Sequence, residues 1–198
     1  MFYRFPFRVA ALGLLLSGIF VLVTHHSGAH QLPATRLSAG NVEAANDQPY
    51  FSPTTNLEEV DVDLIDHAKH SIDVAMYTFT DRRIALALRR AAERDVKIRV
   101  YRDREQFEEE QKRGNTVGNV LSGSPNISIK VKASNELMHE KSFACDGEVL
   151  RSGSGNWSVS AARYQDNEIS VTNSRSSVDA FLEDFAAMWS RSDNVTVQ

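Results

Sequence analysis

One short stretch of this sequence holds residue types that together could bind and attack a phosphate group. The segment HEKSFACDGEVLRSGSGN, residues 139–156, begins with His139 two positions before Lys141 and ends with Asn156. Side chains two positions apart in a strand share a face, so the histidine and the lysine should point the same way. Histidine can act as a nucleophile or proton carrier, while a cation and an amide stabilise negative charge. The pattern predicts a cradle for a tetrahedral anion, most naturally a phosphodiester.

A glycine-rich turn should complete this cradle. After a turn at Asp146, a returning strand ends in Gly153, Ser154 and Gly155, just before Asn156. Glycine has no Cβ, so the two glycines would let the backbone approach a bound group closely, and the serine adds a hydroxyl. Each of these residues alone is more often an ordinary surface or turn residue. Together they form the pattern H-x-K-x4-D-x6-G-S-x-N, for which coincidence is a poor explanation.

Alternating helical and extended patterns must position these residues. Helices are predicted at residues 56–70, 81–95, 104–121 and 176–191. Strands are predicted at 71–80, 96–103, 127–133, 148–153 and 167–172, and the segment 139–146 is also extended. Asn56 can cap the first helix, and Asp81 or Thr80 the second. This order predicts an α/β fold with a mixed β-sheet flanked by helices on both faces.

The N-terminal part is typical of a targeting segment followed by a linker. An uninterrupted apolar run covers residues 9–23, which suits the core of a signal peptide and is short for a full membrane span. We predict a signal peptide or membrane anchor at 1–29, a linker at 30–49 and a catalytic domain at 50–194. The protein would be exported to a periplasm or secreted, or held at the membrane through residues 5–23.

Charge and cysteine content limit the possible functions. The formal net charge is −4, so any attraction for nucleic acid must come from a local patch. Basic segments at 81–83, 88–90 and 111–115 could supply one, although solvated helix faces explain them equally well. The single Cys145 excludes an intrachain disulfide and most cysteine-built metal sites. We expect it to be a small apolar strand residue.

The motif and its surroundings resemble the phospholipase D superfamily, whose signature is known as the HKD motif. The chain is most similar to the single-motif, nuclease-like bacterial branch related to the Zucchini and mitochondrial cardiolipin-hydrolase proteins. The resemblance is carried, besides the motif, by YFSP at 50–53, AMYTFTD at 75–81, RDVKIRVYRD at 94–103, QDNEISV at 165–171 and FLEDFAAMWS at 181–190. The zinc-binding insertion of Zucchini-type proteins is missing.

This resemblance implies hydrolysis of a phosphodiester in two steps, without a metal or any other cofactor. His139 would attack phosphorus and form a phosphohistidine. Lys141, Ser154 and Asn156 would hold the nonbridging oxygens, with Gly153 and Gly155 supporting the phosphate.

The resemblance also assigns roles to three acidic residues. Glu168 would accept a hydrogen bond from the second ring nitrogen of His139 and fix its orientation. Its spacing from Asn156 is one residue longer than in relatives, which leaves Asp166 as a weaker alternative. Asp146 supplies the letter D of the motif, and we assign it to turn and ion-pair structure.

Two-step chemistry needs a further histidine, because the leaving group must gain a proton and the attacking water must lose one. His67 and His70 are expected on the solvated side of the first helix, and His25, His26 and His30 in the N-terminal extension. Larger family members carry two motifs, whereas this chain has one motif and no internal repeat. A homodimer that shares one active site between two copies of His139 is therefore predicted.

Three functions remain open on these grounds. The first is an endonuclease acting on DNA or RNA. The second is a phospholipase D-type hydrolase acting on a cardiolipin-like phospholipid, for which a nearby membrane would be an advantage. The third is a phosphate-binding scaffold that has the fold without the activity.

Overall fold

The computed structural model describes residues 46–114 and 116–198. The predicted signal peptide or anchor at 1–29, and the predicted linker up to residue 45, lie outside these residues. In the part of the chain that is described, no helix is both long and apolar enough to cross a membrane.

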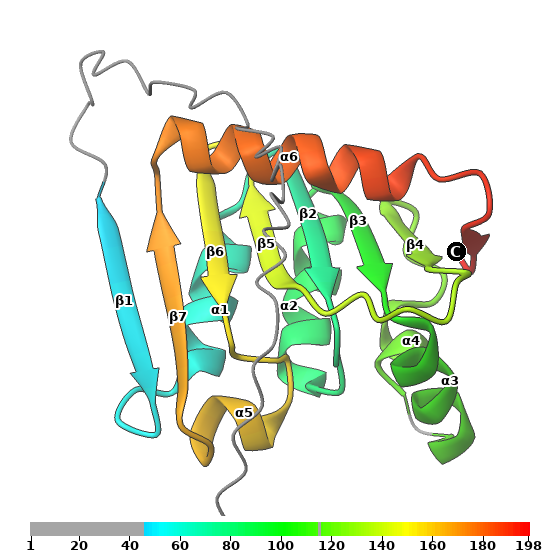
Figure 1. Cartoon of the computed structure of the whole chain (residues 1–198), viewed down its shortest axis with the longest axis horizontal. Helices are drawn as coiled ribbons and strands as arrows, with labels where there is room; N and C mark the ends of the chain where they lie inside the picture. The colour runs from blue at the N-terminus through cyan, green and yellow to red at the C-terminus, as the bar shows by residue number, and fades with distance from the viewer. Residues whose placement is uncertain (1–45, 115) are drawn as a thin grey trace, which may run out of the picture. The chain divides into compact units, whose positions relative to one another are not determined.

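Within the described residues, eight strands form one mixed sheet in the order β1-β7-β6-β5-β2-β3-β4-β8 (Figure 1). Strands β2, β3 and β4 run parallel to one another, and every other neighbouring pair is antiparallel. The strands are β1 (Asp47–Ser52), β2 (Ser71–Met76), β3 (Lys97–Arg102), β4 (Ile127–Val131), β5 (Lys141–Cys145), β6 (Val149–Gly153), β7 (Asn167–Thr172) and β8 (Val195–Thr196).

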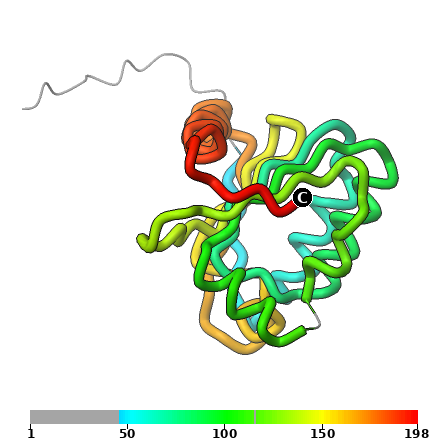
Figure 2. Tube along the Cα trace, turned by 90° about the vertical axis from the view of Figure 1, so that its right-hand side faces the viewer, coloured from blue at the N-terminus to red at the C-terminus, as the bar shows by residue number. Residues whose placement is uncertain are grey.

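Helices cover both faces of this sheet. Helix α6 lies on one face, while α1 and α2 lie on the other (Figure 2). The helices are α1 (Leu57–His67), α2 (Arg82–Glu93), α3 (Arg104–Arg113), α4 (Val117–Leu121), α5 (Val159–Arg163) and α6 (Arg175–Trp189). The predicted α/β fold, a mixed sheet flanked by helices on both faces, is confirmed.

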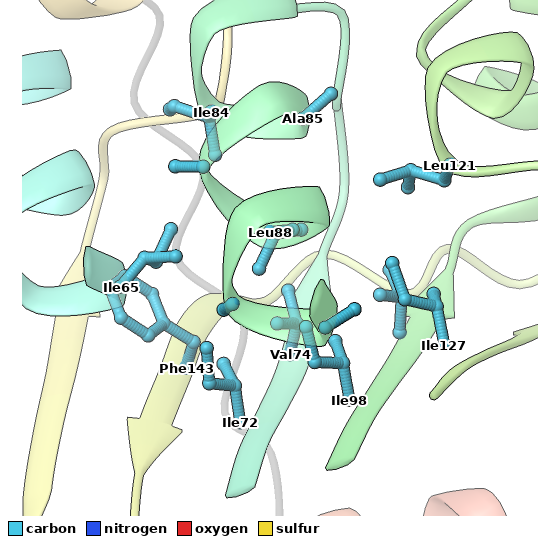
Figure 3. Packing of buried hydrophobic residues seen from close by; sticks show 14 of the residues in the cluster. Ile65, Ile72, Val74, Ile84, Ala85, Leu88, Ile98, Leu121, Ile127 and Phe143 are labelled. Atoms are coloured by element: carbon cyan, nitrogen blue, oxygen red, sulfur yellow. The ribbon is translucent and has the colours of Figure 1, made fainter. Parts of the chain in front are cut away.

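The central strand β2 is buried on both sides, which explains its apolar character. On one face, Ile72 and Val74 pack against Leu88 of α2 in the larger core (Figure 3). On the other face, Ala75 joins a smaller core that includes Phe185 of α6. Alternate residues of one strand thus contribute to two cores, as the twofold repeat of a strand requires.

The predicted helix over 104–121 is broken into α3 and α4. Gly114 ends α3 with a φ of +81°, and its N–H donates to the carbonyl of Gln111. Glycine reaches this left-handed region without a Cβ penalty, which is why it commonly ends helices. Thr116 then caps α4 by accepting from the N–H of Asn119.

The folded unit extends beyond the predicted domain of residues 50–194 at both ends. Strand β1 begins at Asp47, which pairs with Thr172 of β7, and Asn46 donates its N–H to the side chain of Asn173 at 2.8 Å. At the other end, β8 pairs with β4 and forms the outermost strand on that side of the sheet. The three residues before position 50 therefore belong to the sheet and not to a linker.

The N-cap residue of α2, Asp81, carries a negative charge that is unfavourable in the folded protein. Asp81 caps this helix as predicted, with Oδ1 accepting from the N–H groups of Arg83 and Ile84 at 2.9 and 3.3 Å. Its other oxygen, Oδ2, is buried without a donor. Burial, followed by the neighbouring Glu58 carboxylate, raises the pKa of Asp81 from 3.8 to about 6.

We predict that Asp81→Asn stabilises the protein at neutral pH. The folded state binds this proton more tightly than the unfolded state, so stability is lost as the pH rises from about 4 through about 6. Asparagine keeps the cap and carries no charge. Urea unfolding should show the variant to be more stable than the wild type at pH 7.5, with the difference shrinking as the pH falls below about 6 and disappearing below about 3.8. A difference that does not change with pH would contradict this account.

Candidate active site

Apart from Asp146, the predicted site residues gather at one end of the strands, where β2, β3 and β6 end and β5 begins. This end of the sheet is called the catalytic edge below. In Figure 1 this is the edge beside α5. His139 lies just before β5 rather than within it, but the carbonyl of Glu140 still accepts from the N–H of Tyr77 at 2.8 Å. The extended pairing thus continues past Lys141 toward His139. Ligands of open α/β sheets bind at the carboxyl ends of the parallel strands, which is the edge used here.

Lys141 is a nearly buried cation at this edge, with 7% of its surface exposed. Its Nζ donates to the carbonyl of His139 at 2.6 Å and lies 4.9 Å from the ring centroid of Tyr77. Burial, and then the positive charge of Arg151, lower the pKa of Lys141. An ammonium group has three donors, so two remain for the oxygens of a phosphate.

His139 presents its imidazole to solvent beside this cation. The ring packs against Tyr77 in an edge-on arrangement, with the centroids 4.6 Å apart and the planes at 62°. The backbone before it is fixed, because the N–H of Met138 donates to Oδ2 of Asp103 at 2.9 Å. Among the described residues, no hydrogen bond is made to the imidazole nitrogens. The ring is therefore open to an incoming phosphorus atom.

Asn156 and Ser154 are oriented differently from one another. Oδ1 of Asn156 accepts from the N–H of Thr78 at 3.2 Å, which leaves its amide nitrogen as a donor for a ligand. The hydroxyl of Ser154 accepts from the N–H of Glu168 at 3.0 Å and donates to Oδ1 of Asn167 at 2.9 Å. In this structure Asn156 is thus prepared to hold an anion, whereas the hydroxyl of Ser154 is engaged with β7.

The two glycines of the turn make room for protein atoms and not for a ligand, so the predicted reason for them is wrong. Gly153 has a φ of +141°, and a Cβ there would lie 2.3 Å from the carbonyl oxygen of Glu168. A Cβ on Gly155 would lie 3.1 Å from Cγ2 of Ile169 and 3.3 Å from Leu57. Glycine at these positions allows β6 and the turn to pack against β7 and α1.

The predicted hydrogen bond between Glu168 and His139 is not formed within this chain. Glu168 lies on the catalytic edge at the start of β7, next to the buried Ile169, which packs on Leu57 of α1. Because neighbouring residues alternate, Glu168 projects from the opposite face of the sheet, the one covered by α6. Among the described residues its carboxylate makes no hydrogen bond or ion pair, and Asp166 is likewise exposed.

Asp146 lies at the far end of β5 from the catalytic edge. Five steps of extended chain, about 17 Å, separate it from Lys141. Its carboxylate accepts from the N–H groups of Lys69, His70 and Ser71 at 2.9, 2.7 and 2.9 Å. Burial opposes its ionisation, yet these backbone donors hold the pKa of Asp146 below its ordinary value. Asp146, the D of the HKD motif, thus connects the end of β5 to the start of β2.

The other described histidines are also at this far edge. His67 and His70 line a hollow there together with Asp146 and Cys145, so neither can reach the ring of His139. Burial raises the pKa of the Cys145 thiol to about 12, which makes it an inert apolar residue. His25, His26 and His30 lie outside the described residues.

A buried ion pair beneath the motif was not predicted. Arg151 donates to both oxygens of Asp61 at 2.8 and 2.9 Å, and each residue is 1% exposed. The same guanidinium donates to the carbonyls of Lys141 at 2.8 Å and Gly155 at 3.0 Å. Trp157 donates its indole N–H to Asp61 at 2.8 Å. Arg151 therefore joins the histidine–lysine segment to the glycine turn.

A signal for this pair was present in the sequence. In VLRSG, strand alternation places Arg151 on the same face as Gly153 and on the side of α1. A buried arginine requires a carboxylate, and Asp61 interrupts the apolar stripe of α1.

No group of three or more histidine, cysteine or acidic side chains within residues 46–114 and 116–198 is arranged to hold a metal ion. The groups around the anion site are donors and a cation, which suit phosphate oxygens.

A family model described as "Cardiolipin synthase, PLD-like domain" matches residues 62–189, well over half of the chain. The chain is 29% identical over 129 residues to the mitochondrial cardiolipin hydrolase of Xenopus laevis, covering 65% of this chain and 59% of that protein. The human mitochondrial cardiolipin hydrolase is 26% identical, over 62% of this chain and 46% of its own length. The chain thus spans less than two thirds of these curated relatives.

Two solved bacterial structures share the fold. Nuc from Salmonella typhimurium, described as a phospholipase D family member, superposes with a TM-score of 0.67 and 23% identity over 78% of this chain and 99% of its own. NucT from Helicobacter pylori superposes with a TM-score of 0.68 and 20% identity over 76% of this chain and 98% of its own. This chain therefore belongs to the phospholipase D-like family. The predicted resemblance is confirmed.

We predict that Arg151→Met costs about 3–5 kcal/mol of unfolding free energy, because it leaves Asp61 buried without its cation. The double variant Asp61→Leu/Arg151→Met should lose less than the single one, since no unpaired charge remains. Arg90→Met is the matched control. Its pair with Asp66 is partly exposed, at 2.7 Å, and should contribute less than about 1 kcal/mol. Equal losses for Arg151→Met and Arg90→Met in urea unfolding would contradict the role of the buried pair.

Proposed function

We propose that the protein is a metal-independent phosphodiesterase that works through a phosphohistidine, with nucleic acid as its substrate. The observation that carries the proposal is the pairing of an exposed imidazole, His139, with a buried ammonium, Lys141, that keeps two donors free. The amide nitrogen of Asn156 lies on the same edge and is available as a third donor.

The chemistry follows from these groups. A ring nitrogen of His139 attacks phosphorus, the nitrogen–phosphorus bond forms, and the leaving oxygen departs with a proton from a second histidine. Lys141 and Asn156 stabilise the charge on the nonbridging oxygens as phosphorus becomes five-coordinate. Water then attacks the phosphohistidine, gives its proton to that second histidine and releases His139. The support of His139 by Glu168, and the contact of Ser154 with phosphate, stay predictions.

The charges beside the motif turn favour nucleic acid. The N–H groups of Thr80 and Asp81 donate to the carbonyl of Trp157, so the start of α2 adjoins the turn. Three arginines meet there: Arg83 and Arg163 share the one carboxylate of Glu58, and Arg82 is exposed with no ion pair to any described residue. Tyr164, the residue after Arg163, is 74% exposed. Cations interleaved with an exposed aromatic ring are typical of single-stranded nucleic-acid sites.

A phospholipid substrate is the second candidate. The catalytic edge carries exposed apolar side chains, Phe51, Leu137 and Val159, that could contact lipid. The relatives that the chain matches include proteins named for cardiolipin hydrolysis. A hollow on another side of the site is lined by Asp103, Glu105 and Glu108 together with Arg104, and its acidic groups oppose the approach of any polyanion, whether lipid surface or nucleic acid.

The active species is proposed to be a homodimer that shares its catalytic centre. Both described histidines other than His139 lie at the opposite edge of the sheet, so the second histidine is assigned to the partner's motif. Two copies of Lys141 would then surround one phosphate and offset the negative net charge of each chain. The exposed apolar residues of the catalytic edge would help to exclude water from this interface.

We predict that the protein cleaves plasmid DNA or RNA in the presence of EDTA, and that His139→Ala reduces the rate by about 10³-fold or more. Labelled cardiolipin vesicles, tested in parallel, distinguish the two substrates. His67→Ala, at the other edge of the sheet, is the control and should keep wild-type activity. Complete dependence on added metal would exclude the phosphohistidine route. Full activity in His139→Ala would exclude His139 as the nucleophile. No turnover of either substrate would leave the non-catalytic scaffold.

We predict further that inactive chains suppress active ones when subunits exchange. With a ninefold excess of His139→Ala, only about one tenth of wild-type chains pair with each other, so activity per wild-type chain should fall about tenfold. The same excess of His67→Ala, which keeps its His139, should not reduce it. Specific activity that is unchanged in the His139→Ala mixture, or after dilution to a demonstrated monomer, would refute the shared site.

A further inference from the structure

We propose that Tyr77 is a positioning residue of the active site, which sets the orientation of the His139 imidazole and the place of the Lys141 ammonium. The inference rests on the function proposed above for these two residues. Tyr77 directly follows β2, and its N–H donates to the carbonyl of Glu140, the residue between the histidine and the lysine. Its backbone is thereby fixed to the segment whose side chains it contacts.

The ring of Tyr77 contacts both the imidazole of His139 and the ammonium of Lys141. The His139 ring lies edge-on to it, with centroids 4.6 Å apart, and Nζ of Lys141 lies 4.9 Å from its centroid. An edge-on aromatic pair has a preferred geometry, and an ammonium near a ring face is held by the ring's electrostatic field. No other described aromatic ring contacts His139 or Lys141.

The His139 ring needs such a contact. It is exposed and receives no hydrogen bond from the described residues, Glu168 included. An imidazole without neighbours would sample several rotamers, and only one of them directs a ring nitrogen at phosphorus. Tyr77 therefore provides, by packing, the orientation that the motif pattern assigned to a carboxylate.

Lys141 needs a similar restraint. Its one hydrogen bond goes to the carbonyl of His139, so the ammonium is tied to the nucleophile's own backbone. The Tyr77 ring holds the ammonium without using either of its remaining donors, which stay free for phosphate oxygens. A hydrogen-bonding side chain in the same place would have occupied one of them.

Tyr77 is itself held in place from α3. Thr78 donates its hydroxyl to Oε1 of Gln106 at 3.1 Å, and Asp103 caps α3 while accepting from Met138. Burial, and then the charges of Asp103 and Glu105, raise the pKa of the Tyr77 phenol. A phenol whose pKa is raised above its ordinary value stays neutral around neutral pH.

The test uses the full chain with Tyr77→Phe and Tyr77→Leu, on a small soluble phosphodiester, bis(p-nitrophenyl) phosphate. Phenylalanine keeps the ring, so kcat and KM should stay close to wild type. Leucine removes it, and the loss of alignment should lower kcat by about 100-fold while KM changes little. Tyr50→Phe and Tyr50→Leu are matched controls on a partly buried tyrosine of β1 that contacts neither His139 nor Lys141, and neither should lower kcat on this small substrate.

A second measurement does not depend on turnover. In protein labelled with ¹³C and ¹⁵N in histidine, the ring signals of His139 should shift in Tyr77→Leu and not in Tyr77→Phe. The signals of His67 and His70, at the opposite edge, should stay fixed and report that the fold is intact. Tyr77→Met, an unbranched apolar side chain, is measured beside leucine and should behave in the same way, so that one poorly folded variant does not decide the outcome.

Wild-type kcat together with unchanged His139 signals in a folded Tyr77→Leu or Tyr77→Met variant would overturn the inference. A loss of kcat in Tyr77→Phe equal to that in Tyr77→Leu would also overturn it, because the hydroxyl and not the ring would then be the working group. Failure of the proposed function looks different, since His139→Ala would then keep wild-type turnover of the same substrate.

Discussion

A single buried ion pair, between Arg151 and Asp61, joins the parts of the catalytic edge. Two charges removed from water are costly unless geometry and hydrogen bonding are nearly complete. Here both carboxylate oxygens are engaged by the guanidinium, and its remaining donors reach the carbonyls of Lys141 and Gly155. The indole of Trp157 adds a further donor to the carboxylate. The pair is thus well satisfied, and the strand that carries the cation cannot move apart from the turn that carries Asn156.

This arrangement also has an electrostatic effect on the site. A permanent positive charge lies directly beneath Lys141 and, together with burial, lowers its pKa. The ammonium is consequently under-compensated by the protein itself, with a backbone carbonyl and an aromatic face as its partners. An arriving phosphate removes this imbalance. The groups that would bind an anion are therefore already oriented in the folded protein before the anion arrives.

Much of the fold and the principal site residues could be predicted from the sequence, because alternating apolar periods and a motif with fixed spacing are local signals. The break at Gly114 was missed because a charged helical stretch has no strong period on either side of it. Gly153 was predicted as part of the site for a wrong reason, since its close neighbour is the backbone of β7, which only the sheet register reveals. Tyr77 was missed because its partners lie in another element, and such pairing leaves little trace in a single sequence. Arg151 was missed although its place in β6 and the polar Asp61 in the apolar stripe of α1 were signals for a buried pair.

The direction of β1 has a consequence for how the enzyme can be held. Asp47 pairs with Thr172 at the edge remote from His139, and the strand then runs toward the catalytic edge, where Ser52 pairs with Asn167. The polypeptide therefore enters the fold on the side opposite to the reactive imidazole. Any segment attached upstream of Asp47 would join the catalytic unit at the end of the sheet remote from the active site. A lipid held in a surface to which that segment was attached would reach His139 only if the catalytic unit turned, because the two ends of the sheet are about 20 Å apart.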